Sequence, residues 1–228
     1  MTAEGLVERE LRFAFFGDSI CVGQGVSPHR TWAVRLAQRI EAELASAGRR
    51  VCVLNPSING DTTRKALERM AFDIQAAGVD AILVQFGLND ANRWESDRGL
   101  PRVSEAAFAA NLEEIIARAR AFGAGPVLLN TNHPTTRHTQ PFAHHPATYE
   151  AGNRRYNEII REVAARDGQI VLTDIEAAFR ARLAAGAALE SLVLADGLHL
   201  SEAGHDLYLD LLTPPALAAA RQMGAVCR

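Results

Sequence analysis

Cysteine is scarce in this chain. Its 228 residues include three cysteines, at positions 21, 52 and 227. An odd number of widely spaced cysteines does not form a disulfide framework, so we expect reduced thiols. Long apolar runs are missing as well, because no run approaches the roughly 20 apolar residues that cross a bilayer. The acidic N-terminal segment, 1–10, lacks the apolar core of a secretory signal. We therefore expect a cytoplasmic protein with no membrane partner.

The chain also lacks a strong charge of either sign. Its formal net charge is −3 at pH 7. Domains that bind nucleic acid usually present a pronounced basic patch, which this balance gives no reason to expect. We therefore expect a small molecule, and no nucleic acid, as partner. The sequence shows no repeat or linker, and its length suits a single domain over 1–228 that buries a sizeable core. It leaves the oligomeric state open.

Short apolar segments recur along the chain without the strict alternation of strands that have one wet face. They predict five strands, over 13–16, 51–54, 81–86, 127–130 and 170–172. Between them, apolar residues recur with helical spacing. Thr31 and Ser104 each precede such a stretch as a helix N-cap would, and a third stretch runs over 156–163. Alternating strands and helices predict a parallel sheet in a three-layer α/β/α fold.

One motif stands out at the end of the first predicted strand, the sequence Gly17-Asp18-Ser19. In open α/β folds the carboxyl ends of the strands carry the chemistry, so this strand would deliver the Ser19 hydroxyl to that edge. A serine hydroxyl is a weak nucleophile until a base takes its proton. Asp196 and His199, three residues apart, are suited to be the orienting carboxylate and the base. The alternative is that Ser19 caps a helix and that Asp196 forms a turn.

Two further strand ends supply hydrogen-bond donors. Gly60 follows the second predicted strand, and a glycine lets a backbone N–H approach a substrate oxygen closely. Asn89 follows the third strand, and its side-chain amide is a neutral donor suited to the oxyanion of acyl transfer. Taken alone, Gly60 would be a turn glycine and Asn89 a strand-end cap. Together with Ser19 they suggest an oxyanion hole.

These blocks, in this order, resemble those of the SGNH hydrolases, also called the GDSL esterase and lipase family. The matching residues are Gly17-Asp18-Ser19, Gly60, Gly87-Leu88-Asn89-Asp90, and Asp196 with His199, within about positions 11 to 206. The resemblance implies a flavodoxin-like order of five strands and an esterase with Ser19 as nucleophile, His199 as base and Asp196 as its orienter. It also implies an oxyanion hole formed by the Ser19 N–H, the Gly60 N–H and the Asn89 side chain.

The function expected from such a site is hydrolysis of a carboxylic ester through an acyl-enzyme. The expected substrate carries a small acyl or acetyl group on a carbohydrate or a small alcohol, and no cofactor is required. Acyl transfer to an alcohol and hydrolysis of a thioester would use the same residues, so both stay open. A non-catalytic binding module of the same fold is the alternative from another class, and the completeness of the site argues against it.

Two segments at the active edge are expected to form walls of the substrate pocket, 91–103 and 132–149. Within them we expect Asn132, His133 and Trp94 to contact substrate. The second segment holds four histidines, at 133, 138, 144 and 145, which would suit zinc. No carboxylate and no paired ligand spacing accompanies them, so we expect a stiff polar loop and no metal.

Overall fold

A five-stranded parallel sheet forms the centre of the molecule. The computed structural model describes residues 9–226, so Cys227 and most of the acidic N-terminal segment lie outside it. The strands are β1 (Leu11–Gly17), β2 (Val51–Leu54), β3 (Ala81–Gln85), β4 (Val127–Asn130) and β5 (Ile170–Thr173). Their order is β2-β1-β3-β4-β5, and all four pairings are parallel. This confirms the expected flavodoxin-like sheet.

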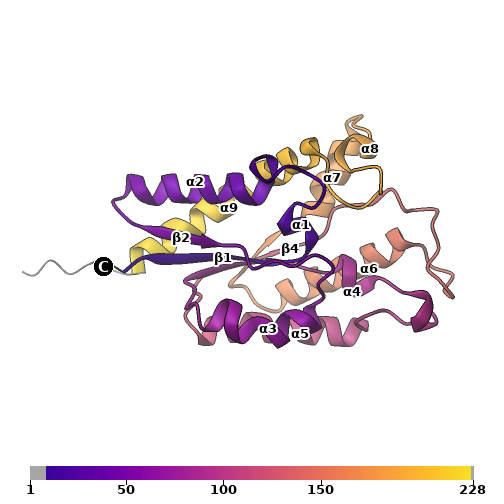
Figure 1. Ribbon diagram of the computed structural model, residues 1–228, viewed down its shortest axis with the longest axis horizontal. Coiled ribbons are helices and arrows are strands. Elements are labelled where there is room, and N and C mark those ends of the chain that lie inside the picture. The colour runs from indigo at the N-terminus through magenta and orange to yellow at the C-terminus, as the bar shows by residue number, and fades with distance from the viewer. Residues whose placement is uncertain (1–8, 227–228) are drawn as a thin grey trace, which may run out of the picture.

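Helices cover both faces of the sheet. Figure 1 shows α2 and α9 on one face and α3, α5 and α6 on the other. The helices are α1 (Ser19–Val22), α2 (Trp32–Ser46), α3 (Thr63–Met70), α4 (Leu88–Ala91), α5 (Glu105–Ala121), α6 (Tyr149–Ala165), α7 (Ile175–Ala184), α8 (Leu189–Leu192) and α9 (Glu202–Val226). Short 3-10 turns (Pro28–Arg30, Glu95–Asp97) and a π-helical turn (Ala71–Gln75) complete the chain path. Within the described residues, none of these helices combines the length and the apolar character that a bilayer span requires.

The two faces of the sheet explain why the strands read as continuous apolar runs. Phe13 and Phe15 of β1 point into the core layer beneath α2 and α9, whereas Ala14 and Phe16 point into the layer beneath α3, α5 and α6. All four side chains are fully buried. Successive residues of a strand face opposite sides, so a strand buried on both faces needs apolar residues at every position.

The helix starts follow from local capping. The Thr31 side chain accepts the Val34 N–H at the start of α2, and the Ser104 side chain accepts the Ala107 N–H at the start of α5, as the sequence predicts. Helix α6 begins earlier than its predicted stretch, at Tyr149, because Thr148 caps it. The loop that follows β4 therefore ends at 148 and brings the first turn of α6 close to the carboxyl edge of the sheet.

Candidate active site

Ser19 occupies the first helical position after β1. Helix α1 is capped by Asp18, whose Oδ1 accepts the Ile20 N–H at 3.0 Å. The Ser19 hydroxyl is therefore not the cap and is free for another partner. A Cβ at Gly17 would lie 2.5 Å from Cys21 Sγ, closer than side chains tolerate. Glycine at this position lets Cys21 and the backbone of Gln85 approach the end of β1 closely.

His199 joins Ser19 to Asp196. Its Nε2 lies 2.9 Å from Ser19 Oγ, and its Nδ1 lies 2.6 Å from Asp196 Oδ2. The other carboxylate oxygen, Oδ1, accepts the backbone N–H groups of Leu198 and His199 at 2.9 and 3.0 Å. Because the carboxylate is fixed within its own turn, it holds the imidazole with the Nδ1 hydrogen toward Asp196 and the Nε2 lone pair toward Ser19.

Asp196 stays ionised although it is partly buried. Partial burial acts to raise the pKa of this carboxyl, but hydrogen bonds from the His199 ring and from the Leu198 and His199 N–H groups outweigh it. Together they hold the pKa below its ordinary value. With 41% of its side chain exposed, Asp196 depends on these bonds rather than on burial for its fixed position. An ionised Asp196 keeps the hydrogen on Nδ1.

Asn89 lies beside the segment that carries Ser19. Its Nδ2 donates to Asp18 Oδ2 at 3.1 Å. Burial raises the pKa of Asp18 to about 7, against the hydrogen bond from Ile20, and the neighbouring Asp90 carboxyl adds to the rise. An amide nitrogen carries two hydrogens, so one binds Asp18 and the second is available to a ligand oxygen.

Gly60 lies in a turn tied to the same strand end. The turn is closed by the Asp61 N–H donating to Ile58 O at 3.2 Å, and Gly60 takes the left-handed conformation with φ +74°. The Ile58 N–H donates to Gly17 O at 3.2 Å, and Arg102 Nη1 donates to Gly60 O at 3.1 Å. The Ile58 contact ties the Gly60 turn to the segment that carries Ser19, and Arg102 holds Gly60 itself. Sequence reasoning missed Arg102.

Comparison with known proteins identifies the family of this chain. The sequence model described as the GDSL-like Lipase/Acylhydrolase family matches residues 15–207. The chain belongs to this family. It is an ester hydrolase of the GDSL type.

Individual relatives extend the likeness over most of this GDSL hydrolase. Esterase TesA of Pseudomonas aeruginosa is 26% identical over 198 residues, which are 87% of this chain and 84% of that protein. A lipase/acylhydrolase from Enterococcus faecalis is 25% identical with a TM-score of 0.68, covering 91% of this chain and 96% of the other. Axe2, an acetylxylan esterase from Geobacillus stearothermophilus, shares the fold with a TM-score of 0.70 at 19% identity, covering 90% and 94% of the two chains.

Asn132 and His133 lie beneath the site of this GDSL hydrolase rather than on its surface. Both are 0% exposed. Asn132 Oδ1 accepts from Gln85 Nε2 at 2.7 Å, and its Nδ2 donates to Phe86 O at 3.0 Å. The chain stays beside β5 after β4 ends, since the Thr131 N–H still donates to the β5 carbonyl at Thr173. The contact with substrate that we expect from the sequence is therefore not supported for these two residues.

Both ring nitrogens of His133 are used inside the protein. Nε2 lies 2.7 Å from Leu198 O, and Nδ1 lies 2.8 Å from the Tyr208 hydroxyl. A carbonyl oxygen only accepts, so Nε2 carries the hydrogen and Nδ1 accepts from Tyr208. Burial lowers the pKa of His133 to about 4, although the hydrogen bond to Leu198 acts the other way. His133 is thus a neutral, buried side chain that links Tyr208 to the backbone of the turn 196–199.

The low pKa of His133 predicts a pH-dependent loss of stability. Between pH 6.5 and about 4 the unfolded chain binds a proton at His133 that the folded chain does not, so the free energy of unfolding falls as the pH is lowered. We expect urea unfolding to show that the free energy of unfolding falls between pH 7 and pH 5 by about 2 kcal/mol more in the wild type than in His133→Gln. Equal losses in both proteins would contradict a neutral, buried His133.

The histidines of the loop 132–149 were considered as metal ligands. In the part of the chain that the structure describes, no group of three or more His, Cys, Asp or Glu side chains could hold a metal ion. His138 and His144 are exposed, and His145 Nδ1 accepts the Ala147 N–H at 3.1 Å within the loop. The loop contributes to the site through other residues, Thr136 and Arg137, that sequence reasoning missed.

Proposed function

We propose that this GDSL hydrolase cleaves carboxylic esters by a two-step covalent route with Ser19 as nucleophile. The observation that carries the proposal is the pair of hydrogen bonds that links Asp196 to Ser19 through the His199 ring. Asp196 Oδ2 lies 2.6 Å from His199 Nδ1, and His199 Nε2 lies 2.9 Å from Ser19 Oγ. These separations lie within the reach of a general base toward the hydroxyl that it activates. Along the sequence the serine comes first, then the aspartate and then the histidine, which is the order of the blocks in the GDSL family.

In the first step, Ser19 Oγ attacks the ester carbonyl while its proton moves to His199 Nε2. Asp196 accepts the Nδ1 hydrogen and stabilises the imidazolium that forms. When the tetrahedral intermediate collapses, His199 returns the proton to the departing alcohol and the acyl group remains on Ser19. In the second step, His199 activates a water molecule that attacks the acyl-enzyme and releases the carboxylic acid.

The oxyanion of the tetrahedral intermediate needs donors that are already in place. We assign this role to the Ser19 N–H, the Gly60 N–H and the free hydrogen of the Asn89 amide. The support is that Asn89 contacts Asp18, the residue directly before Ser19, and that Ile58 of the Gly60 turn contacts Gly17, two residues before it. Donors fixed before the reaction stabilise developing charge without reorganising.

The substrate that we propose is an ester with a small acyl group, such as an acetylated sugar or small alcohol. The segment 91–103, the expected pocket wall beside Gly60, carries Trp94, which is 51% exposed. The Arg102 guanidinium lies 4.3 Å from the centre of that ring and also donates to Gly60 O. Arg102 thus contacts both Trp94 and Gly60, whose N–H belongs to the proposed oxyanion hole. Flat apolar rings at such a position suit stacking against a sugar or an aromatic leaving group.

A panel of substrates tests the proposed function. We expect purified protein to turn over p-nitrophenyl acetate, with rates compared against butyryl and longer esters, acetylated xylooligosaccharides and acyl thioesters. Added alcohol acceptors distinguish acyl transfer from hydrolysis, because transfer yields a new ester in place of the acid. Folded protein that turns over no member of the panel would overturn the proposal and favour a binding module.

Replacing the exposed aromatic ring tests the proposed wall. We expect Trp94→Ala to change the ratio of kcat/KM values between acetylated sugar and p-nitrophenyl acetate by about fivefold, because one lost stacking contact is worth about 1 kcal/mol. The rate at which a fluorophosphonate labels Ser19 should stay within about twofold, since the reacting groups are untouched.

Phe122→Ala is the matched control for Trp94→Ala. Phe122 is 50% exposed, but it follows α5 and precedes β4, at the opposite edge of the sheet. We expect the control to leave every ratio unchanged. A Trp94→Ala protein that loses activity equally on all esters, or keeps all ratios, would show that this ring does not select substrates.

A further inference from the structure

We propose that the segment 133–137 is a splint that holds the turn 196–199 in its reactive shape, and that Glu150 is the positioning residue that keeps this splint in place. The inference rests on the proposed function, because it assigns a cause to the orientation of His199. None of the residues involved contacts Ser19. Their contribution would come through the position of the His199 ring.

The splint holds the backbone of the turn 196–199. Three successive carbonyl groups each accept one hydrogen bond: that of Asp196 from Arg137 Nε (3.0 Å), that of Gly197 from the Thr136 N–H (3.0 Å), and that of Leu198 from His133 Nε2 (2.7 Å). His199 follows directly after these three residues. A shift of the splint therefore moves the backbone from which the imidazole projects, and a misplacement of about 1 Å costs on the order of 10²-fold in rate.

The close approach of the two segments requires glycine at position 197. Gly197 has a left-handed φ of +73°, and a Cβ there would lie 2.3 Å from Thr136 Oγ1. A side chain would be strained by the backbone conformation and would also push Thr136 away. The glycine between Asp196 and His199 thus allows both the turn and the contact with the splint.

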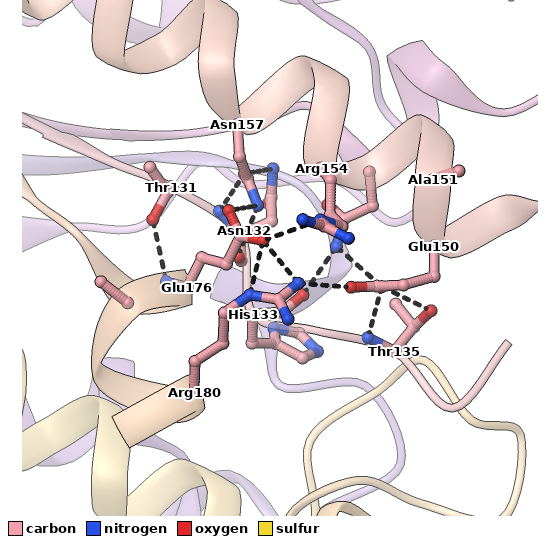
Figure 2. A network of polar contacts seen from close by, with 12 residues as sticks. Thr131, Asn132, His133, Thr135, Glu150, Ala151, Arg154, Asn157, Glu176 and Arg180 are labelled. Carbon is pink, nitrogen blue, oxygen red and sulfur yellow. Dashed lines mark hydrogen bonds and ion pairs between the residues drawn. The ribbon is translucent and has the colours of Figure 1, made fainter. Parts of the chain in front are cut away.

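Glu150 anchors the splint from the other side. Its Oε2 accepts the Thr135 N–H at 2.8 Å and the Thr135 hydroxyl at 3.1 Å. Asn153 Nδ2 lies 3.3 Å from the same oxygen and donates to His133 O at 2.9 Å. Figure 2 shows the contact between Glu150, in the first turn of α6, and Thr135. The middle of the splint is therefore fixed to helix α6.

A buried carboxylate at this place needs a partner of opposite charge, and Arg180 supplies it. Arg180 Nη2 lies 3.3 Å from Glu150 Oε1 and 2.8 Å from Glu176 Oε1, so it bridges the two carboxylates in Figure 2. The Glu150 side chain is 11% exposed. A carboxylate so far from water is retained where its hydrogen bonds and its ion pair compensate the lost hydration.

Capping of α6 does not account for Glu150. Thr148 already caps this helix through the hydrogen bond from the Ala151 N–H at 3.2 Å. Acidic residues in a first helical turn ordinarily face solvent, where they stabilise the helix by interacting with its dipole. Glu150 instead turns inward and satisfies both donors of Thr135, which is 1% exposed. Its contacts therefore point to a role in holding the segment 133–137.

Two substitutions at Glu150 and one matched control test the proposal. We expect Glu150→Ala to lower kcat for p-nitrophenyl acetate by roughly 10- to 100-fold, with KM within about twofold, because a misplaced base weakens the chemical step rather than binding. Glu150→Gln keeps an oxygen that accepts from Thr135, so we expect kcat within about threefold of wild type. The control is Glu176→Ala, which removes an equally buried partner of Arg180 that makes no bond to 133–137.

Hydrogen–deuterium exchange of the peptide covering 194–200 provides a readout that does not depend on turnover. We expect at least about tenfold faster exchange there in Glu150→Ala, recovery in Glu150→Gln, and no change in Glu176→Ala. Unchanged exchange in folded Glu150→Ala, equal acceleration in the control, or accelerated exchange with wild-type kcat would each overturn the positioning role. Accelerated exchange in a protein that hydrolyses no ester even as wild type would support the splint and overturn the proposed function.

Discussion

Ser19→Ala is expected to lower kcat/KM for p-nitrophenyl acetate by about 10⁴-fold or more, while the protein stays folded. The expectation follows because the attacking oxygen is lost, whereas His199 and the oxyanion donors alone retain only a small part of the rate acceleration. Ser19 is 6% exposed and its side chain contacts the His199 ring, so removing one oxygen leaves the packing of β1 and α1 intact. The measurement is steady-state hydrolysis, with circular dichroism to confirm the fold.

Ser57→Ala is the matched control for this substitution. Ser57 also lies near the carboxyl edge of the sheet, but its Oγ donates to Phe15 O at 3.2 Å and faces no base. We expect the control to retain activity within a few-fold of the wild type. Comparable losses in both variants, or wild-type activity in Ser19→Ala, would show that Ser19 is not the nucleophile.

Asn89→Ala is expected to lower kcat by ~10²–10³ with little change in KM. The reason is that an oxyanion donor stabilises charge that is present mainly in the transition state. The variant also removes the donor to Asp18 Oδ2. Since burial holds the pKa of Asp18 near 7, the expected loss includes any shift of the Asp18 carboxyl, and measurements above and below pH 7 separate the two effects.

Asn92→Ala provides the control for Asn89→Ala. Asn92 ends the same short helix, and its Oδ1 accepts the Arg93 N–H at 2.8 Å, away from Ser19. We expect it to keep kcat and KM near the wild-type values. If Asn89→Ala raised KM and left kcat unchanged, Asn89 would hold the ground-state substrate rather than the oxyanion.

The fold could be predicted because its determinants are local and repetitive. Strands buried on both faces must be apolar throughout, so β1 and β3 are visible as short runs such as Phe13 to Phe16. Thr31 and Ser104 mark helix starts because a side-chain oxygen satisfies a free N–H there. The predicted bounds of β2 and β4 are confirmed, whereas those of β1, β3 and β5 differ by one or two residues, since hydrogen bonds to neighbouring strands, rather than composition, decide where a strand stops.

The proximity of the side chains in the candidate site could be predicted for a related reason. The carboxyl ends of parallel strands meet at one edge, so residues that follow β1, β2 and β3 lie close together whatever their distance in sequence. Asp196 and His199 meet within one turn of chain, which makes their contact a local property of the spacing. The sequence alone therefore predicts that Ser19, Asn89, Asp196 and His199 lie at this edge of the sheet.

The supporting residues could not be found in this way. His133 looks like the start of a loop, and only the Tyr208 hydroxyl, 75 residues later, and the backbone of Leu198 make it an internal strut. Glu150 looks like an ordinary acidic residue near a helix start until its contact with Thr135 is seen. Such pairings depend on tertiary packing and leave no pattern in the local sequence.

Covalent labelling tests the central claim most directly. The wild-type protein is treated with a fluorophosphonate, digested and analysed by mass spectrometry, in parallel with His199→Ala. If His199 activates Ser19 as the geometry indicates, the adduct lies on Ser19 and its rate of formation falls by at least about 10³-fold in His199→Ala. An adduct on any other residue, or equal labelling of Ser19 without His199, would contradict the proposed nucleophile and its base.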